Sequence, residues 1–335
     1  MRKQIITSTG YGGTGSSAIT DLLKEFDSGI SMGDAEFWFL QDYDGVSDLE
    51  YYLIDGNHRS KVSMAISNFI KYIKTHSAFY NKFFGENFIK YSNEYINSLV
   101  DARFKKALSD YEVNNSFLKL WYFKLYPIMQ LGIKKILKQD TFEFSPKIRL
   151  IDKYYSIPDK NRFYIETKKY TSKLFSLLDT DNKYKFIAID QLVPSINTNR
   201  YFNYIDNLKV IVVDRDPRDL FLLNETHWNG ASYICDTTNV YEYINWYKTM
   251  REHRKIEEKN DNVVYIMIEE LIYEYDKSLE RLYKFLGLAK DEHINKRQCF
   301  NPDVSKNWTR LWKKYPKYKK EVEIIREHLN EYCYK

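Results

Sequence analysis

The chain has 335 residues, of which 44% are hydrophobic, enough to build the core of one large α/β domain with insertions. A net charge of only +5 lacks the basic excess of nucleic-acid-binding domains, so we expect no nucleic acid as a partner, although local basic pockets for anionic ligands are compatible with it. The three cysteines, Cys235, Cys299 and Cys333, are scattered without metal-ligand spacing, which predicts a protein without metal in a reduced, cytoplasmic compartment.

A glycine-rich turn joins the first predicted strand to the first predicted helix. Residues 3–9 form a short run typical of a strand, and apolar residues recur at helical spacing between 18 and 26. Gly29 follows as the expected helix stop. The turn itself, Gly10–Ser17 with the sequence GYGGTGSS, offers backbone N–H groups and a helix start that together could surround a phosphate.

The turn fits several kinds of phosphate site. A Walker loop for ATP or GTP needs a lysine where Ser16 stands, and without it the β- and γ-phosphates lose their main partner. A phosphosulfate loop needs no such lysine, because its ligand carries less charge and no magnesium, and Thr14, Ser16 and Ser17 supply hydroxyl donors. A turn that only packs the helix against the strand is a further alternative that the loop alone leaves open.

The same glycines also match a dinucleotide-binding motif. Gly10, Gly12 and Gly15 spell G-x-G-x-x-G, and Asp34 or Glu36 lies at about the spacing of the acidic residue that binds the ribose. A lone fingerprint is a weak signal, and the polar run before it is unusual for that motif. An NAD(P)-dependent oxidoreductase is therefore an alternative function.

A mostly helical insertion is predicted at about residues 60–180, where glycine and proline are rare and amphipathic patterns are long. Within it, Phe117–Lys138 is aromatic, apolar and basic. This pattern is more typical of a core helix, with peripheral contact to a membrane surface as the alternative. No apolar run in the sequence has the length of a transmembrane segment.

Three short apolar runs rich in β-branched residues predict further strands at 186–190, 209–213 and 263–268. Helical patterns separate these runs, which is typical of a parallel sheet. In open α/β sheets the ligands bind at the carboxyl ends of the strands, so the residues that follow these runs are candidates for a site.

The segment Val210–Asn224, VIVVDRDPRDLFLLN, places Arg215 where a buried strand meets a helix. Asp216 is expected to cap the helix, with Asp219 completing a pair like a capping box. Arg215 is then fixed at the ligand-binding edge, ready for bidentate contact with a phosphate. The alternative is a structural ion pair of Arg215 with Asp214 or Asp219.

Taken in order, these motifs resemble the sulfotransferase family that uses 3′-phosphoadenosine 5′-phosphosulfate (PAPS). GGTGSS is similar to the family's 5′-phosphosulfate loop, and RDPRD to its 3′-phosphate segment. Ile266–Leu288 looks like the family's strand, acidic turn and helix ending in F-L-G-L. Ser305–Tyr315, SKNWTRLWKKY, looks like its C-terminal nucleotide loop. The likeness spans nearly the whole chain and leaves out only the helical insertion.

The resemblance implies a P-loop-NTPase-like, three-layer α/β fold with a central parallel sheet. A single domain would cover residues 1–335, with the helical insertion at about 60–180 and a nucleotide-capping segment at about 300–335. Trp308 or Trp312 would support that segment. The residues that would hold PAPS are Gly12, Gly13, Thr14, Gly15, Ser16, Ser17, Arg215, Lys306 and Asn307.

Two positions depart from the family pattern. Many members carry a lysine or arginine where Gly13 stands, which leaves the cation at the leaving phosphate unassigned. Arg59 is the first candidate for that cation. The family's serine eight residues after the motif arginine is Leu223 here, so Asn224 is the expected donor if the helix turns it inward.

Two residues are candidates for the general base that takes the acceptor's proton. Glu36, in DAEFWF, resembles the acidic segment of saccharide sulfotransferases. His58 lies beside Arg59 in a basic cluster of the right chemistry for an anionic pocket. Asp34 and Asp190 are the next candidates if neither serves.

The resemblance thus implies an enzyme that moves a sulfuryl group from PAPS, without metal, to a hydroxyl or amine of an acceptor, expected to be a glycan or glycolipid. The alternatives are the oxidoreductase and a protein of the same fold that binds PAP, the desulfated product, but has lost catalysis. The glycine at position 13 gives a reason for that loss. The sequence leaves the acceptor and the oligomeric state open.

Overall fold

A computed structural model describes residues 3–107, 121–138, 150–228 and 235–335. Its central element is a five-stranded, all-parallel sheet with the strand order β2-β5-β1-β6-β7. The strands, in that order, are β2 (Gly29–Glu36), β5 (Phe186–Asp190), β1 (Gln4–Gly10), β6 (Leu208–Asp214) and β7 (Val263–Met267).

The inner strands form because short apolar runs are buried on both faces of the sheet. Every residue of β5 is buried, and β6 is buried except at Lys209. Four of the five strands lie where the periodicity predicts them. β2 lies at the edge of the sheet and lacks a continuous apolar run, so the periodicity does not reveal it.

The first helix is shorter than predicted, and Gly29 does not end it. α1 (Ser17–Leu23) ends well before Gly29, which is the first residue of β2. A β-carbon at Gly29 would lie 1.9 Å from the ring of Phe186, so glycine is required there by the close approach of that ring.

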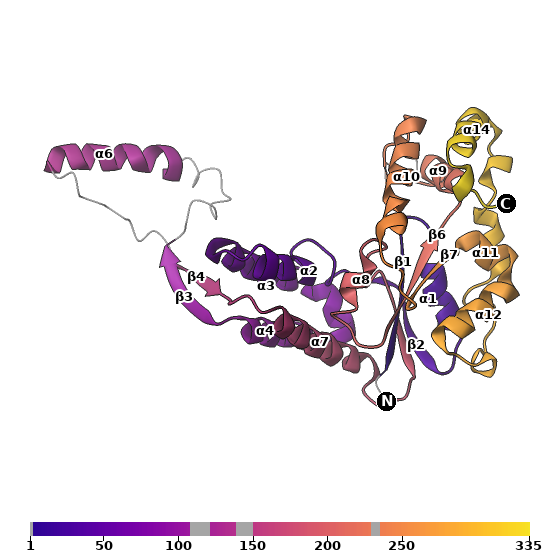
Figure 1. The fold of residues 1–335 in the computed structure, drawn as a ribbon, viewed down its shortest axis with the longest axis horizontal. Helices are drawn as coiled ribbons and strands as arrows, with labels where there is room; N and C mark the ends of the chain where they lie inside the picture. The colour runs from indigo at the N-terminus through magenta and orange to yellow at the C-terminus, as the bar shows by residue number, and fades with distance from the viewer. Residues whose placement is uncertain (1–2, 108–120, 139–149, 229–234) are drawn as a thin grey trace.

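Helices cover both faces of the sheet. α1, α11 (Ile268–Tyr273) and α12 (Tyr275–Leu286) lie on one face, where their apolar residues pack with β1, β5, β6 and β7 (Figure 1). The other face contacts a larger lobe of helices, described next. The expected α/β class, with a central parallel sheet between helical layers, is confirmed.

The segment predicted as a helical insertion contains two elements that the prediction lacks. The strands β3 (Ala102–Ala107) and β4 (Leu150–Tyr155) pair antiparallel as a small second sheet. The helices of this lobe and its flanks are α2 (Val46–Glu50), η1 (Tyr51–Asp55), α3 (Arg59–Phe84), α4 (Asn87–Leu99), η3 (Trp121–Leu125), α6 (Tyr126–Leu137), α7 (Lys160–Ser176), η4 (Leu177–Asp179) and α8 (Thr198–Tyr201).

Phe117–Leu120 of the predicted apolar and basic helix lie outside the described residues, and the rest of that segment forms η3 and α6. Among the described residues, no helix is both long enough and apolar enough to cross a membrane.

The C-terminal third packs around the end of β6. α9 (Pro217–Thr226), α10 (Val240–Ile256) and α14 (Lys319–His328) share one apolar cluster (Figure 1). The short elements between and after them are η5 (Lys290–Glu292), α13 (Pro302–Ser305), η6 (Lys306–Trp308), η7 (Leu311–Lys313), η8 (Pro316–Tyr318) and η9 (Asn330–Tyr332).

Candidate functional site

The carboxyl ends of the five strands meet at one edge of the sheet, as a parallel arrangement requires. β1 ends at Gly10, β2 at Glu36, β5 at Asp190 and β6 at Asp214. Most of the residues that the sequence nominates follow one of these strand ends. The fold therefore gathers them at the edge where open α/β sheets bind ligands.

The glycine-rich turn after β1 leaves most of its backbone N–H groups without acceptors among the described residues. Gly12 and Gly15 have φ angles of +87° and +93°, which residues with a β-carbon rarely adopt. Thr14 is buried, and its Oγ1 accepts a hydrogen bond from the N–H of Tyr11 at 3.3 Å. Among the residues that the structure describes, none accepts a hydrogen bond from the N–H groups of Gly12–Ser16. Such a turn can bind an anion through its backbone.

Arg215 connects the glycine-rich turn to the C-terminal segment. One guanidinium N–H donates to the carbonyl oxygen of Gly13 at 3.3 Å, and another donates to the carbonyl oxygen of Trp308. Arg215 is 7% exposed, its Nε has no hydrogen-bond partner among the described residues, and burial lowers the pKa of its guanidinium. The nearby carboxyl groups of Glu269, Asp219 and Asp216 favour its charged form, but no described carboxylate accepts a hydrogen bond from the guanidinium, which leaves Nε available to a polar ligand.

Asp214, which precedes Arg215, is engaged by other arginines. It pairs with Arg251 and Arg254 of α10, each at 2.6 Å, and these cations hold the pKa of its carboxyl low although burial raises it. Arg254 also donates through Nε to the hydroxyl of Tyr11 at 3.0 Å, which brings a second cation beside the glycine-rich turn. Neither arginine stands out in the sequence, because only the fold places α10 next to this edge.

The acidic residues of α9 anchor the C-terminal segment. Asp216 caps α9 as predicted, by accepting a hydrogen bond from the N–H of Arg218 at 2.9 Å. The prediction that Asp219 completes a capping-box pair is wrong, because its carboxylate accepts the N–H groups of Arg310 and Leu311 at 2.8 and 2.7 Å. Burial raises the pKa of Asp219 to about 7. Since neither Asp214 nor Asp219 pairs with Arg215 across the described residues, the contacts do not favour a purely structural ion pair.

Glu269, in the acidic turn after β7, is a buried acid at the same corner. Its Oε1 accepts a hydrogen bond from the N–H of Asp216 at 3.1 Å, whereas its Oε2 has no partner among the described residues. Burial raises the pKa of Glu269 to about 8, although Arg215 opposes the rise. Buried polar atoms are rarely left unpaired in folded proteins, so the two unpartnered atoms, Arg215 Nε and Glu269 Oε2, point to a polar ligand.

Asp190, at the end of β5, binds the part of the glycine-rich turn that contains Ser16. Its carboxylate accepts hydrogen bonds from the hydroxyl groups of Ser8 at 2.9 Å and Ser16 at 3.3 Å. Gln191 donates to the Oγ of Ser16 at 3.0 Å. Burial raises the pKa of Asp190 to about 7, more than the serine bonds lower it, and the charge of Glu36 adds to the rise.

Glu36 lies beside Asp190, because the two residues are register partners of β2 and β5. Its side chain is exposed, and its Oε2 accepts a hydrogen bond from Trp38 Nε1 at 3.0 Å. Glu36 is thus an accessible carboxylate at the same edge as the glycine-rich turn. Asp34, the further candidate on β2, is also exposed.

The strand order argues against the dinucleotide alternative. That motif needs its acidic residue at the end of a strand that neighbours the first one. Here β5 separates β2 from β1, so Asp34 and Glu36 lie two strands from the turn, at roughly 4.8 Å per strand.

The structure does not bring His58 and Arg59 to the turn. They lie exposed at the amino end of α3, which packs beside β4 through a hydrogen bond from the N–H of Tyr154 to Ser63 at 3.2 Å. The other end of α3 reaches the sheet, where the hydroxyl of Tyr80 accepts hydrogen bonds from the backbone after Glu36. At 1.5 Å per residue, about 30 Å of helix separates the two ends.

The side chains of the other residues predicted to contact PAPS, Asn224, Lys306 and Asn307, bind other groups or are exposed. Asn224 is buried as expected, but its Nδ2 donates to Thr237 Oγ1 at 2.7 Å, and its Oδ1 has no partner among the described residues. Lys306 pairs with Asp303 at 2.6 Å on the surface, and Asn307 is exposed. The backbone of the C-terminal segment, rather than these side chains, contacts the motif arginine.

A basic cavity of about 510 Å³ opens beside the C-terminal segment. Trp312 forms part of its wall, and the guanidinium of Arg218 lies 3.8 Å from the centre of its ring. Trp308, in contrast, is 46% exposed. Trp312 is therefore the better support for this segment. The cations that line the cavity are Arg218, Arg310, Lys313, Arg326 and Lys335. Their positive field favours anionic ligands at this end of the molecule.

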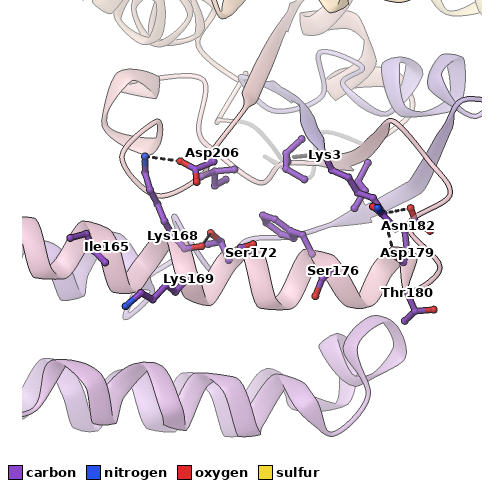
Figure 2. Close-up of a pocket in the computed structure, with 15 residues that line it drawn as sticks. Lys3, Ile165, Lys168, Lys169, Ser172, Ser176, Asp179, Thr180, Asn182 and Asp206 are labelled. Carbon is purple, nitrogen blue, oxygen red and sulfur yellow. Dashed lines mark hydrogen bonds and ion pairs between the residues drawn. The ribbon is translucent and has the colours of Figure 1, made fainter. Parts of the chain in front are cut away.

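A second cavity, of about 570 Å³, lies at the opposite, amino-terminal edge of the sheet. Figure 2 shows Lys168 paired with Asp206, and Lys3 paired with Asp179, along its wall. No residue nominated by the sequence lines it. Across the described residues, no three His, Cys, Asp or Glu side chains gather in the way that holding a metal ion would need.

No protein-family model matches the chain, and no curated protein matches it. Among solved structures it is similar to the sulfotransferase STF1 from Mycobacterium tuberculosis H37Rv, at 12% identity over 98% of this chain and 76% of that chain, with a TM-score of 0.36. It is similar to the sulfotransferase domain from the curacin biosynthetic pathway, at 12% identity over 98% of both chains, with a TM-score of 0.41.

It is also similar to retinol dehydratase, solved in complex with androsterone and the inactive cofactor PAP, at 13% identity over 100% of this chain and 83% of that chain, with a TM-score of 0.33. Likenesses this weak carry no argument about what this chain binds or does, which rests on its own motifs and geometry.

Proposed function

We propose that the chain is a sulfotransferase that moves a sulfuryl group from PAPS to a hydroxyl or amine of an acceptor. One observation carries this proposal. Arg215, in RDPRD, donates hydrogen bonds both to Gly13 of the glycine-rich turn and to Trp308 of the C-terminal segment. Three motifs that are far apart in the sequence, and that together resemble the sulfotransferase family, therefore meet at one buried cation.

The residues at this corner fit a nucleotide with a 5′-phosphosulfate and a 3′-phosphate. The N–H groups of Gly12–Ser16, which have no acceptor among the described residues, would hold the 5′ end, with the hydroxyl group of Ser17 beside them. Arg215, whose Nε has no partner in the described part of the chain, would hold the 3′-phosphate. PAPS, when bound, supplies the activated sulfuryl group and the leaving phosphate.

Arg254 is the proposed replacement for the cation that the sequence lacks at position 13. It contacts the hydroxyl of Tyr11 beside the turn, whereas Arg215 is assigned to the 3′-phosphate. Arg254 would stabilise negative charge that develops beside the turn, which is the main electrostatic task in such a transfer. Arg59 is too far along α3 to share this task.

Glu36 is the proposed general base. Asp190 is occupied by Ser8 and Ser16 and so holds the turn in place. Glu36 is exposed at the same edge, where an acceptor can reach it. A positioned base typically contributes about 10²–10⁴-fold to turnover.

We further propose a saccharide acceptor, either a glycan or a glycolipid. The proposal rests on the likeness of DAEFWF to the acidic segment of saccharide sulfotransferases. The indole of Trp38 is 39% exposed and donates a hydrogen bond to Glu36, so a sugar ring could stack on it beside the proposed base. A glycan array probed with labelled sulfate from PAPS would identify the acceptor.

Calorimetry with PAP tests the nucleotide site. We expect binding at low-micromolar concentration that is unchanged by EDTA, because the turn has no Walker lysine and the ligand needs no metal. A thermal-shift panel with PAP, NAD⁺ and NADP⁺ separates the oxidoreductase, and sulfate transfer from PAPS separates an enzyme from an inactive binding protein. Strict magnesium dependence, or stabilisation by NAD⁺ and not by PAP, would overturn the proposal.

A further inference from the structure

Helix α6 stands apart from the core of the molecule. It lies with β3 and β4 at the end opposite the C-terminal helices (Figure 1). None of its residues is buried, and its main neighbour among the described elements is η3, the turn that precedes it. The sequence pattern favours a core helix here, and that prediction is wrong, because no apolar layer of the described chain covers this helix.

The exposed side chains of α6 are large and apolar. Ile136 is 81% exposed and Ile128 is 66% exposed, values unusual for isoleucine. Helical spacing places Met129, Ile133 and Ile136 on one face. Further exposed apolar side chains at this end of the molecule are Leu125, Leu131, Leu137 and, on β3, Phe104.

All the charged residues of this segment are basic. Residues 121–138 contain no aspartate or glutamate, and Lys134 and Lys138 lie on the flank of α6 opposite its apolar face. β3 adds exposed cations at the same end of the molecule. Against these, the described residues of β3, α6 and β4 contain one acid, Asp152. The exposed or half-buried cations are Arg103, Lys105, Lys106, Lys124, Lys134, Lys135 and Lys138, whereas Lys153 is buried.

We propose that α6 binds the surface of an anionic lipid bilayer, with its apolar face in the headgroup region and its lysines against lipid phosphates. α6 carries Met129, Ile133 and Ile136 on one face, Lys134 and Lys138 on the other and no acids, with Leu131 exposed beside those lysines, an arrangement that resembles the interfacial amphipathic helix. Trp121 and Tyr126, at the start of the segment, are the aromatic types that gather at membrane interfaces. α6 is about 18 Å long at 1.5 Å per residue, too short to cross a bilayer core of about 30 Å.

The charge pattern favours lipid over a second copy of the chain. Two copies of α6 packed face to face would bring their lysines together, and residues 121–138 offer no acid to balance them. Anionic headgroups supply that balance at every position. Resting on the proposed sulfotransferase function, this surface favours an acceptor held at a membrane, a glycolipid rather than a free glycan.

Vesicle co-sedimentation of the full chain tests the proposal without nucleotide or acceptor. We expect binding to vesicles with about 30% phosphatidylserine and at least tenfold weaker binding to pure phosphatidylcholine. Ile136→Asp and Lys135→Glu/Lys138→Glu should each lower binding to the anionic vesicles by tenfold or more. Because α6 has no buried residue and contacts mainly η3 among the described elements, both variants should keep the melting temperature of the parent chain.

Matched controls lie at the other end of the molecule. Ile256→Asp changes an isoleucine that is 85% exposed at the end of α10, and Lys284→Glu/Lys296→Glu reverses two exposed lysines near α12. Both should bind vesicles like the parent. Absence of vesicle binding by the parent, equal loss in the controls, or a dimer in sedimentation velocity that Ile136→Asp abolishes would each overturn the proposal. PAP calorimetry without vesicles reports separately on the proposed function.

Discussion

The two edges of the parallel sheet differ in how their charged groups are satisfied. At the amino-terminal edge a cavity of about 570 Å³ is open, yet its lysines are paired, as Lys168 is with Asp206 at 2.9 Å (Figure 2). At the carboxyl-terminal edge Arg215 and Glu269 are buried, and each keeps a polar atom without a partner among the described residues. The amino-terminal edge thus has an open cavity with paired charges, whereas the carboxyl-terminal edge has buried charged side chains with unpaired polar atoms among the described residues.

The difference shows why volume is a poor guide to the site. A buried polar group without a partner costs about 1–3 kcal/mol, and a ligand that supplies the partner recovers that free energy. A cavity whose charges are already paired offers a polar ligand no such gain. We therefore expect changes at the carboxyl-terminal edge to affect function strongly, and changes at the amino-terminal edge to affect it little.

The largest expected effect is on turnover. Glu36→Gln should lower sulfate transfer by roughly 10²-fold or more and leave PAP affinity unchanged, because in the proposed site the turn and Arg215, and not this carboxylate, hold the nucleotide. Asp190→Asn should instead weaken PAP binding, since Asp190 positions Ser16. Transfer rates at saturating PAP, with calorimetry alongside, separate the two effects.

His58→Ala is the matched control for that comparison. Because His58 lies at the far end of α3, its loss should change transfer by less than about twofold. Loss of transfer in His58→Ala together with full activity in Glu36→Gln would reverse the assignment. The likeness of DAEFWF to saccharide enzymes would then be misleading.

The next effect is on nucleotide affinity. Arg215→Ala should weaken PAP binding by about 1.5–3 kcal/mol, the range for a charge-assisted hydrogen bond. Arg162→Ala, which removes an arginine paired with Asp101 at 2.7 Å in the helical lobe, is the control and should leave PAP affinity unchanged. Calorimetry measures both, and an equal affinity in Arg215→Ala and the parent would reduce Arg215 to a structural role.

The fold was predictable where local pattern and burial agree. The buried strands of the sheet follow from short β-branched runs, because residues inside a parallel sheet are apolar on both faces. The edge strand β2 and the small sheet of β3 and β4 escaped prediction, since their exposed residues leave no such run. α6 was taken for a core helix because periodicity reports an apolar face and not what covers it.

The site was predictable only at strand ends. Arg215 and the glycine-rich turn could be nominated because each directly follows a predicted strand. Arg254 could not, since its place beside Tyr11 depends on how α10 packs. His58 and Arg59 were nominated by their chemistry, which carries no information on the length of the helix that separates them from the sheet.

A smaller effect concerns stability and pH. Asp190 and Asp219, with pKa near 7, and Glu269, with pKa near 8, all have pKa values raised by burial above those of the unfolded chain. Through these three groups the folded chain binds more protons than the unfolded chain between about pH 5 and 8, so their contribution to the free energy of unfolding falls as pH rises through that range, whereas the pKa of His253, lowered by burial, acts in the opposite direction. We expect the melting temperature without ligand to drop by several degrees.

Glu269→Gln tests the main contributor to that slope. The glutamine does not titrate, so its variant should lose less stability than the parent between pH 7 and 8. Differential scanning at a series of pH values gives the two slopes. A parent chain whose melting temperature rises from pH 5.5 to 8 would contradict the assignment of raised pKa values to this edge.

The smallest effect is expected at the amino-terminal edge. Lys168 and Asp206 are each more than a third exposed, so water screens their attraction and the pair should contribute less than about 1 kcal/mol. Lys168→Ala should therefore shift the melting temperature by only a degree or two and leave PAP affinity and transfer unchanged. If Lys168→Ala instead weakens PAP as much as Arg215→Ala does, the ligand binds in the open cavity, and the rule that unsatisfied charge outranks volume fails for this protein.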